Sequence, residues 1–194
     1  DLSVNAGFRG EGVDIFNPRV PGVPAISGDE NLPPPLRGTD PGMLGKNSVY
    51  GFSAGIIHDT RDSPFLPTQG HLATFEFEQV IGTFIYPRGV LEARQYWLLN
   101  QRPDGSGRHV LSLGSILGFS GPNTPAYDNF YAGGYNTMRG FVFRGASPVQ
   151  RSKTTGQLAT VGGPFEWLNT LEYMFPITAD DSLRGVVFTD FGTV

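Results

Sequence analysis

Residues 129–141 read NFYAGGYNTMRGF, and they lie in the longest part of the chain without regular alternation of apolar and polar residues. Gly133 and Gly134 stand in the middle of this stretch, and Gly140 follows an arginine near its end. Glycine adopts the backbone angles that tight turns need, so the stretch predicts a turning loop. The loop as a whole runs from residue 120 to 161, and the segments that flank it have a different pattern.

Apolar and polar residues alternate with a period of two in seven segments outside this loop. Such alternation predicts strands with one apolar and one polar face. The segments comprise residues 2–9, 50–56, 73–78, 89–100, 111–119, 165–175 and about 183–191. Helix-period segments are hard to find, so we expect an all-β protein.

The connections between these segments differ in length in a regular way. The two longest, residues 17–46 and 120–161, follow the first and the fifth segment. In an antiparallel sheet they therefore lie at the same end of the strands. Transmembrane barrels place short turns on the periplasmic side and long loops outside.

Two architectures fit the alternation equally well. The polar positions hold Ser, Thr, Gly, Glu and Arg, as expected for a water-filled barrel lumen, but a soluble β-sandwich gives the same pattern. Aromatic residues at strand ends favour the membrane, because such residues form interface girdles. These residues are Tyr50, Tyr96, Trp97, Phe119, Phe165, Trp167, Tyr173 and Phe175.

The composition excludes several classes of protein. Charged residues make up 16 % of the 194 residues, well below the roughly 25 % usual in soluble domains. No run of about 18 apolar residues predicts a membrane helix. The net charge of −4 argues against a nucleic-acid partner, because phosphate binding requires concentrated Lys and Arg. The absence of cysteine excludes disulfide scaffolds and thiolate metal sites.

Three stretches resemble the BamA family of outer-membrane β-barrel assembly factors, the bacterial surface antigen family. NFYAGGYNTMRGF resembles the family's loop signature, an apolar residue followed by Arg-Gly-Phe. HDTRDSPFLPTQGHL at residues 58–72 resembles its D-x-R-D and P-x-x-G hairpin. GGPFEWLNTLEYMFPI and GVVFTDFGTV resemble the strand pair after the loop. The matching positions are Met138, Arg139, Gly140 and Phe141 in the loop, and Asp59, Arg61, Asp62, Pro67 and Gly70 in the hairpin.

The resemblance covers roughly residues 50–194 and implies an antiparallel transmembrane β-barrel. Residues 1–194 would form part of a sixteen-stranded barrel domain, its seventh to thirteenth strands. Residues 17–46 would be a variable surface loop, whereas residues 120–161 would fold back into the lumen. Because strand alternation begins in the first residues and seven strands do not close a bacterial barrel, we expect further strands on both sides.

An arginine carried into a lumen needs acidic partners, because burying its charge alone is costly. The resemblance implies Glu172 and Asp190 as partners of Arg139. Glu172 shares the polar face of its strand, but the face of Asp190 is ambiguous. A symmetric hairpin around residue 179 offsets the two carboxylates by about four residues, or roughly 13 Å. Arg139 is then expected to reach one closely and the other only in a shifted register, and both stay candidates.

The remaining motif residues have structural interpretations. Gly133, Gly134 and Gly140 are expected to let the loop turn tightly and approach the barrel wall, and Phe141 to pack beside the arginine. Whether the docked loop serves stability alone or also function stays open. For the hairpin we favour ordinary turn charges over catalysis.

Enzyme motifs are missing from the sequence. His58 is followed by Asp59, but neighbours on a strand face opposite sides. His71 and His109 show no ligand spacing, and no G-x-S-x-G elbow occurs. We therefore expect no catalytic function, no metal and no cofactor.

The function implied by the resemblance is an insertase that folds and inserts β-barrel proteins into the bacterial outer membrane. In the family, a client strand adds to the edge of an opening seam by backbone hydrogen bonds. The implied partners are outer-membrane lipids, unfolded outer-membrane protein clients and accessory lipoproteins. A two-partner-secretion-type translocation pore is the alternative within the family, and a soluble β-sandwich binding domain is the alternative from another class.

Overall fold

The computed structural model describes residues 1–15, 45–151, 158–178 and 181–194. Apart from its last two positions, the surface loop expected at residues 17–46 lies outside these described residues. No helix within this part of the chain is long and apolar enough to cross a membrane.

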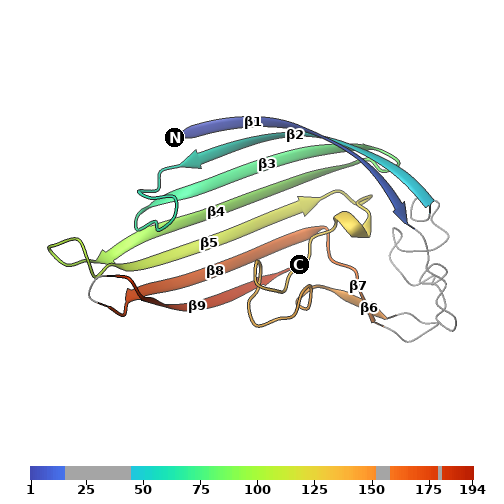
Figure 1. The fold of residues 1–194 in the computed structure, drawn as a ribbon. Coiled ribbons are helices and arrows are strands. Elements are labelled where there is room, and N and C mark those ends of the chain that lie inside the picture. The colour runs from blue at the N-terminus through green and yellow to red at the C-terminus, as the bar shows by residue number, and fades with distance from the viewer. Residues whose placement is uncertain (16–44, 152–157, 179–180) are drawn as a thin grey trace.

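Seven strands form one antiparallel sheet in the order β1-β2-β3-β4-β5-β8-β9 (Figure 1). Each predicted segment corresponds to one strand, and each strand extends beyond at least one of its predicted ends. Their bounds are β1 Leu2–Ile15, β2 Gly45–Asp59, β3 Gly70–Gly82, β4 Tyr86–Asn100, β5 His109–Ser120, β8 Phe165–Pro176 and β9 Arg184–Thr193. The all-β prediction is confirmed.

The connections lie as their lengths predicted. Residues 121–164 link β5 to β8 at the end of the sheet where β1 ends and β2 begins (Figure 1). The turns at the opposite end, called here the short-turn end, comprise residues 60–69, 101–108 and 177–183. The end that carries residues 121–164 also carries the short turn at residues 83–85 between β3 and β4.

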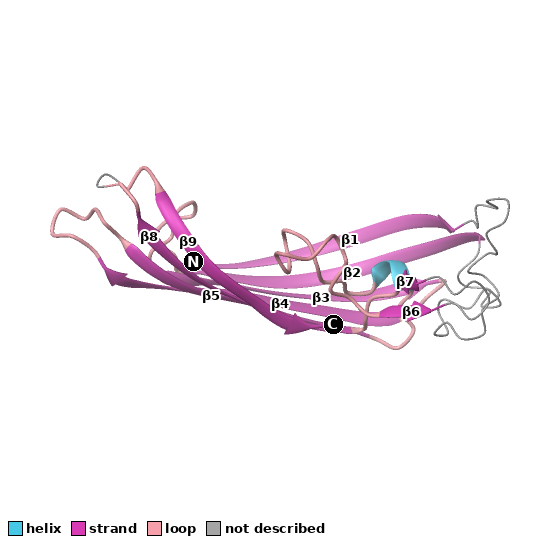
Figure 2. Ribbon diagram, turned by 90° about the horizontal axis from the view of Figure 1, so that it is seen from below, coloured by secondary structure: helices cyan, strands magenta, loops and turns pink. Residues whose placement is uncertain are grey.

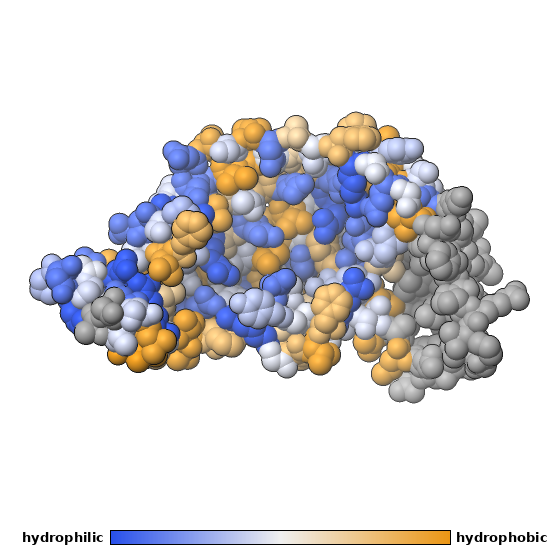
Figure 3. Space-filling view, in the orientation of Figure 1, coloured by the Kyte–Doolittle hydropathy of each residue, from blue (hydrophilic) through white to orange (hydrophobic). Residues whose placement is uncertain are grey.

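The two faces of the sheet differ in polarity. Residues directly opposite one another in the register, such as Ser112 and Glu172 or Thr170 and Asp190, share a face. That face carries the polar alternation, and Figure 3 shows hydrophilic residues gathered over it, with apolar residues prominent along the upper and lower margins.

The other face presents large apolar side chains that stay 37–75 % exposed. They are Leu2, Val4, Phe8, Tyr50, Phe52, Ile56, Phe75, Phe77, Leu91, Trp97, Leu99, Leu113, Leu117, Phe119, Phe165, Trp167, Leu171, Tyr173, Val187 and Phe191. A continuous apolar face of this extent is the lipid-facing surface of a membrane barrel. In the described residues the only other sheet is the two-stranded β6–β7 pair, so the sandwich interpretation, which needs a second layer, is wrong.

The sheet bends into a trough, and the long loop occupies its inner side (Figure 2). Within the loop are the 3-10 helix η2 (Ala126–Asp128) and the hairpin strands β6 (Val149–Arg151) and β7 (Leu158–Thr160). Buried side chains gather on this inner side: Val49, Val80 and Tyr86 from the sheet, and Ala126, Phe130 and Ala132 from the loop. The core of the described residues therefore lies between the loop and the inner wall.

Candidate functional site

Two residues near the start and the end of the loop pair with each other. Phe130 and Gly163 exchange two backbone hydrogen bonds of 2.9 and 3.0 Å. Further along, the Gly134 amide donates to the Met138 carbonyl at 3.1 Å and closes the turn that carries the arginine. The Arg-Gly-Phe tip is therefore presented by a hydrogen-bonded turn.

Arg139 contacts both candidate carboxylates at once. Its Nη1 donates to Glu172 Oε1 at 2.7 Å. Its Nη2 and Nε donate to the two oxygens of Asp190 at 2.7 and 2.8 Å, which makes a bidentate fork. The backbone amide of Arg139 adds a bond of 3.0 Å to Asp190 Oδ2. The hydrogen bonds to Asp190 raise the pKa of Arg139 above its ordinary value, so the guanidinium stays charged.

The centre of the last hairpin expected from the sequence, residue 179, is wrong by one residue, which shifts the pairing of the two strands by two residues. Glu172 lies opposite Phe188, and Thr170 lies opposite Asp190, so the two carboxylates are offset by two residues instead of four. Both point to the inner face, where one guanidinium reaches both. The turn sets this register, because the Ile177 amide donates to the Leu183 carbonyl at 2.8 Å and thereby centres the hairpin on residue 180.

Asp190, which accepts the two guanidinium hydrogen bonds, also accepts a hydrogen bond from β8. The Thr170 hydroxyl donates to Asp190 Oδ1 at 2.9 Å from the neighbouring strand. The Asp190 side chain is only 4 % exposed, against 24 % for Arg139. Asp190 is thus the more buried partner, and Glu172, at 20 % exposure, is a second and more exposed acceptor for the same guanidinium.

The aromatic residue beside the arginine is Phe188, not Phe141 as expected. The guanidinium carbon of Arg139 lies 3.5 Å from the centre of the Phe188 ring, a cation–π contact. Phe141 is half exposed. Phe188 was missed because both faces of β9 carry apolar residues, among them Val186 and Val187, so alternation does not identify the inner face.

The three glycines serve the loop's own turns, which corrects the expectation that they approach the wall. Gly133, Gly134 and Gly140 have φ angles of 113°, 103° and 89°, a region that favours glycine. A Cβ on Gly133 would lie 2.6 Å from the Gly145 amide nitrogen, whereas one on Gly140 would meet nothing within 4 Å. Their common contribution is therefore backbone conformation.

A second attachment of the loop has no counterpart in the sequence motifs. Arg9 of β1 donates through Nη2 to Asp128 Oδ2 at 2.9 Å and through Nε to Glu78 Oε1 at 3.0 Å. The Tyr86 hydroxyl donates to the same Asp128 carboxylate. Burial opposes ionisation of Asp128, but the hydrogen bonds from Arg9 and Tyr86 hold its pKa below the usual value. The loop is thus bound to β1 and β4 as well as to β8 and β9.

The hairpin motif forms a self-contained turn between β2 and β3. Arg61 makes a fork with Asp59, with contacts of 2.8 and 3.0 Å. The Asp62 carboxylate accepts from the backbone amides of Thr68 and Gln69. Pro67 lies within this turn, and Gly70 ends it with a φ of 94°. These contacts agree with the expectation that the charged residues of the hairpin motif stabilise a turn.

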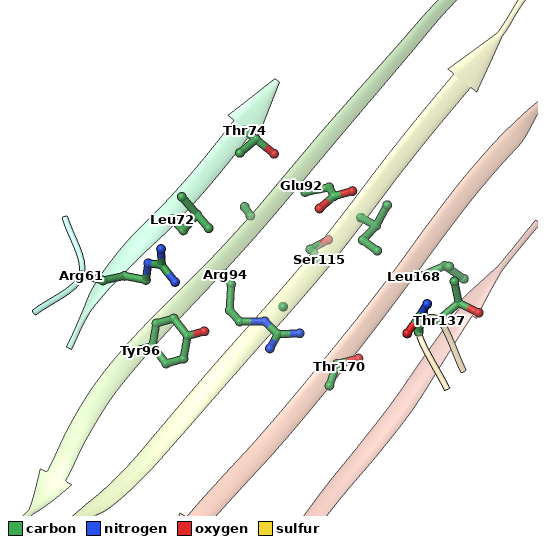
Figure 4. Close-up of a pocket in the computed structure, with 14 residues that line it drawn as sticks. Arg61, Leu72, Thr74, Glu92, Arg94, Tyr96, Ser115, Thr137, Leu168 and Thr170 are labelled. Carbon is green, nitrogen blue, oxygen red and sulfur yellow. The ribbon is translucent and has the colours of Figure 1, made fainter. Parts of the chain in front are cut away.

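A cavity of about 320 Å³ remains between the loop tip and the inner wall. Figure 4 shows Glu92, Arg94 and Thr170 projecting into this space from β4 and β8. Asn136 and Thr137 of the loop complete the lining. In the described residues no group of three or more His, Cys, Asp or Glu could hold a metal ion.

A curved sheet with an apolar outer face and a polar inner face, onto which a loop is docked by an arginine, is the wall of a transmembrane β-barrel. The model of the Omp85 superfamily domain matches residues 26–194. The chain therefore belongs to the Omp85 superfamily.

A solved structure supports the same fold. The crystal structure of BamA from Haemophilus ducreyi lacking POTRA domains 1-3 is similar, with a TM-score of 0.67 and 21 % sequence identity. The match covers 77 % of this chain and 30 % of that one. The chain thus spans less than a third of the length of this structural relative.

Proposed function

We propose that the protein containing this chain is an insertase that folds and inserts β-barrel proteins into the bacterial outer membrane. Membership of the Omp85 superfamily, the BamA-like fold and the exposed apolar outer face support this role. The outer face would contact membrane lipids, and unfolded outer-membrane proteins would be the clients. Accessory lipoproteins are proposed as further partners.

The observation that carries the proposal is the docked loop, in which Arg139 binds Asp190 and Glu172. An unpaired sheet edge inside a bilayer costs several kcal/mol for each unsatisfied backbone group, so a seam that opens to a client needs a rigid wall elsewhere. In this proposal the loop stiffens that wall and acts on clients only indirectly. The client is joined by backbone hydrogen bonds, and the chain performs no catalysis.

A translocation pore of the two-partner secretion type is the second candidate. The polar inner face and the cavity of about 320 Å³ beside the loop favour it, because both offer a water-filled path. The Asn-Phe-Tyr-Ala-Gly-Gly stretch at residues 129–134 favours the insertase, by its resemblance to assembly factors.

The test is reconstitution of the complete protein in liposomes. Urea-unfolded outer-membrane barrel proteins are added outside, and their folding is followed by the heat-sensitive mobility of folded barrels in electrophoresis. We expect faster folding than in empty liposomes, and slower folding when Arg139→Ala replaces the wild type. His109→Ala, on the outer face, is the matched control and is expected to behave as wild type.

The same liposomes separate the two candidates. An unfolded exoprotein offered as cargo should stay accessible to external protease if the protein is an insertase. Protection of the cargo without any acceleration of barrel folding would reject the insertase and support the pore.

A further inference from the structure

The chain has three histidines, and all of them lie near the short-turn end of the sheet. His58 is the last residue but one of β2, His71 is the second residue of β3, and His109 is the first residue of β5. His58 lies opposite Ala73 in the register, so His58 and His71 are diagonal neighbours on one face. That face is the outward one, because His58 alternates with the inward residues Ile57 and Asp59.

The two imidazoles of this diagonal pair point at each other. His58 Nδ1 lies 2.9 Å from His71 Nε2, and the ring centres are 4.8 Å apart at an interplanar angle of 55°. A neutral imidazole has one donor and one acceptor nitrogen, so the two facing nitrogens share one proton. The two nitrogens that would bind a metal ion are thus already directed at a common point.

Thr60 holds the second ring in this orientation. Its Oγ1 lies 3.1 Å from His71 Nδ1, the nitrogen that faces away from His58. The same oxygen accepts from the His71 backbone amide at 2.9 Å. A hydrogen bond on the far nitrogen is the usual outer-shell partner of a metal-binding histidine, because it fixes the tautomer and the ring angle.

We propose that His58 and His71 form a binding site for one divalent late transition-metal ion. Imidazole nitrogens suit Cu²⁺, Ni²⁺ and Zn²⁺, with Cu²⁺ bound most tightly. The ion takes the place of the shared proton, and that proton moves to the other nitrogen of the ring that carried it, so that both imidazoles bind the metal as neutral ligands. Metal–nitrogen bonds of about 2.0–2.1 Å in tetrahedral geometry require only a small separation of the two rings, and His58 is exposed. Water fills the remaining coordination positions.

The site lies at the short-turn rim of the outward face. It adjoins the turn at residues 60–69, which carries the Asp62 carboxylate and the Arg61 guanidinium. A bound ion would connect β2 to β3 at the rim of the sheet. Because it binds the folded arrangement of two strands, it would stabilise the folded state by mass action.

His109 supplies a matched control. It lies on the same outward face, but its Nδ1 is 2.7 Å from the Tyr173 hydroxyl, and no second imidazole faces it. A single histidine offers only one ligand, so His109 is not expected to bind tightly. Any loss of metal binding on its replacement would point to unspecific surface binding.

The experiment titrates Cu²⁺ into the complete protein in detergent micelles, without a histidine tag, and follows binding by calorimetry and electron paramagnetic resonance. We expect one Cu²⁺ per chain with coupling to two nitrogens. His58→Ala and His71→Ala should each weaken binding at least about ten-fold, and Thr60→Val about ten-fold, whereas His109→Ala should leave it unchanged. Coupling to one nitrogen, or equal losses for His58→Ala and His109→Ala, would overturn the proposal.

A stability measurement guards against variants that fail to fold. Zn²⁺ should raise the temperature at which the folded band disappears in electrophoresis for wild type and for His109→Ala. The same ion should not raise it for His58→Gln, which keeps a polar side chain of similar reach. An equal rise in all three proteins would reject the two-histidine site.

Discussion

Arg139 and Asp190 are joined by three hydrogen bonds, two from the guanidinium and one from the backbone amide of the arginine. The backbone bond fixes the position of the loop tip, and the fork fixes the direction of the side chain. The contact between Arg139 and Asp190 therefore depends on the position of the loop backbone as well as on charge.

Arg139→Ala should release the loop tip from the inner wall. The change leaves Asp190 and Glu172 without their cation, and losing charged hydrogen bonds of this kind costs about 2–3 kcal/mol. Protease cleavage within residues 120–161 on whole cells should increase. Arg139→Lys should recover only part of the protection, because a lysine cannot form the fork. Unchanged cleavage in Arg139→Ala with normal barrel assembly would disprove the docking role.

Asp128→Asn should weaken the second attachment of the loop. The neutral amide no longer balances Arg9, which then depends on Glu78 and on the more distant Glu11. The two attachments share no residue, so their effects on unfolding free energy should add within about 0.5 kcal/mol in the double variant Asp128→Asn with Arg139→Ala. A denaturant titration of wild type, both single variants and the double variant measures this. A much larger combined loss would mean that the attachments act as one unit.

Phe188→Leu should cost less than the loss of the ion pair. The substitution keeps an apolar side chain under Arg139 but removes the ring, and a cation–π contact of this kind contributes about 0.5–2 kcal/mol. The Arg139→Ala background is the control, because there the ring has no cation to bind. An identical loss in both backgrounds would assign the effect to packing instead.

Gly70→Ala and Gly105→Ala should separate two costs of adding a Cβ, which are strain of the backbone and collision with neighbouring atoms. Both glycines have positive φ, 94° and 81°. A Cβ on Gly70 would collide with the Thr60 carbonyl, whereas one on Gly105 would meet nothing within 4 Å. Gly105→Ala should therefore lose about 1 kcal/mol from backbone strain, and Gly70→Ala clearly more. Equal thermal midpoints of the two variants would contradict this order.

Alternation was enough to find all seven strands, because one face of each strand is set by lipid and the other by water. It was not enough for the register of β8 and β9. That register depends on the turn, where Asp181 adopts a φ of 57° and its carboxylate accepts from the Gly107 amide and from Arg108 of the neighbouring turn. Contacts between turns leave no periodic trace in a sequence.

The candidate site was predictable only where a motif exists. Arg139, Glu172 and Asp190 were named from the resemblance, and the structure brings them together. Arg9 and Asp128 are 119 positions apart, and no local pattern links them. His58 and His71 are 13 positions apart in the sequence, and only the register across β2 and β3 makes them neighbours.

The loop binds the first strand of the sheet and its last two strands. Its Asp128 contacts Arg9 of β1, and its Arg139 contacts β8 and β9. In mechanical terms it is a chord across an arc. A chord limits how far its arc can open, so the loop residues between the two attachments limit the flattening of this wall. The strands set the curvature, and the loop resists its loss.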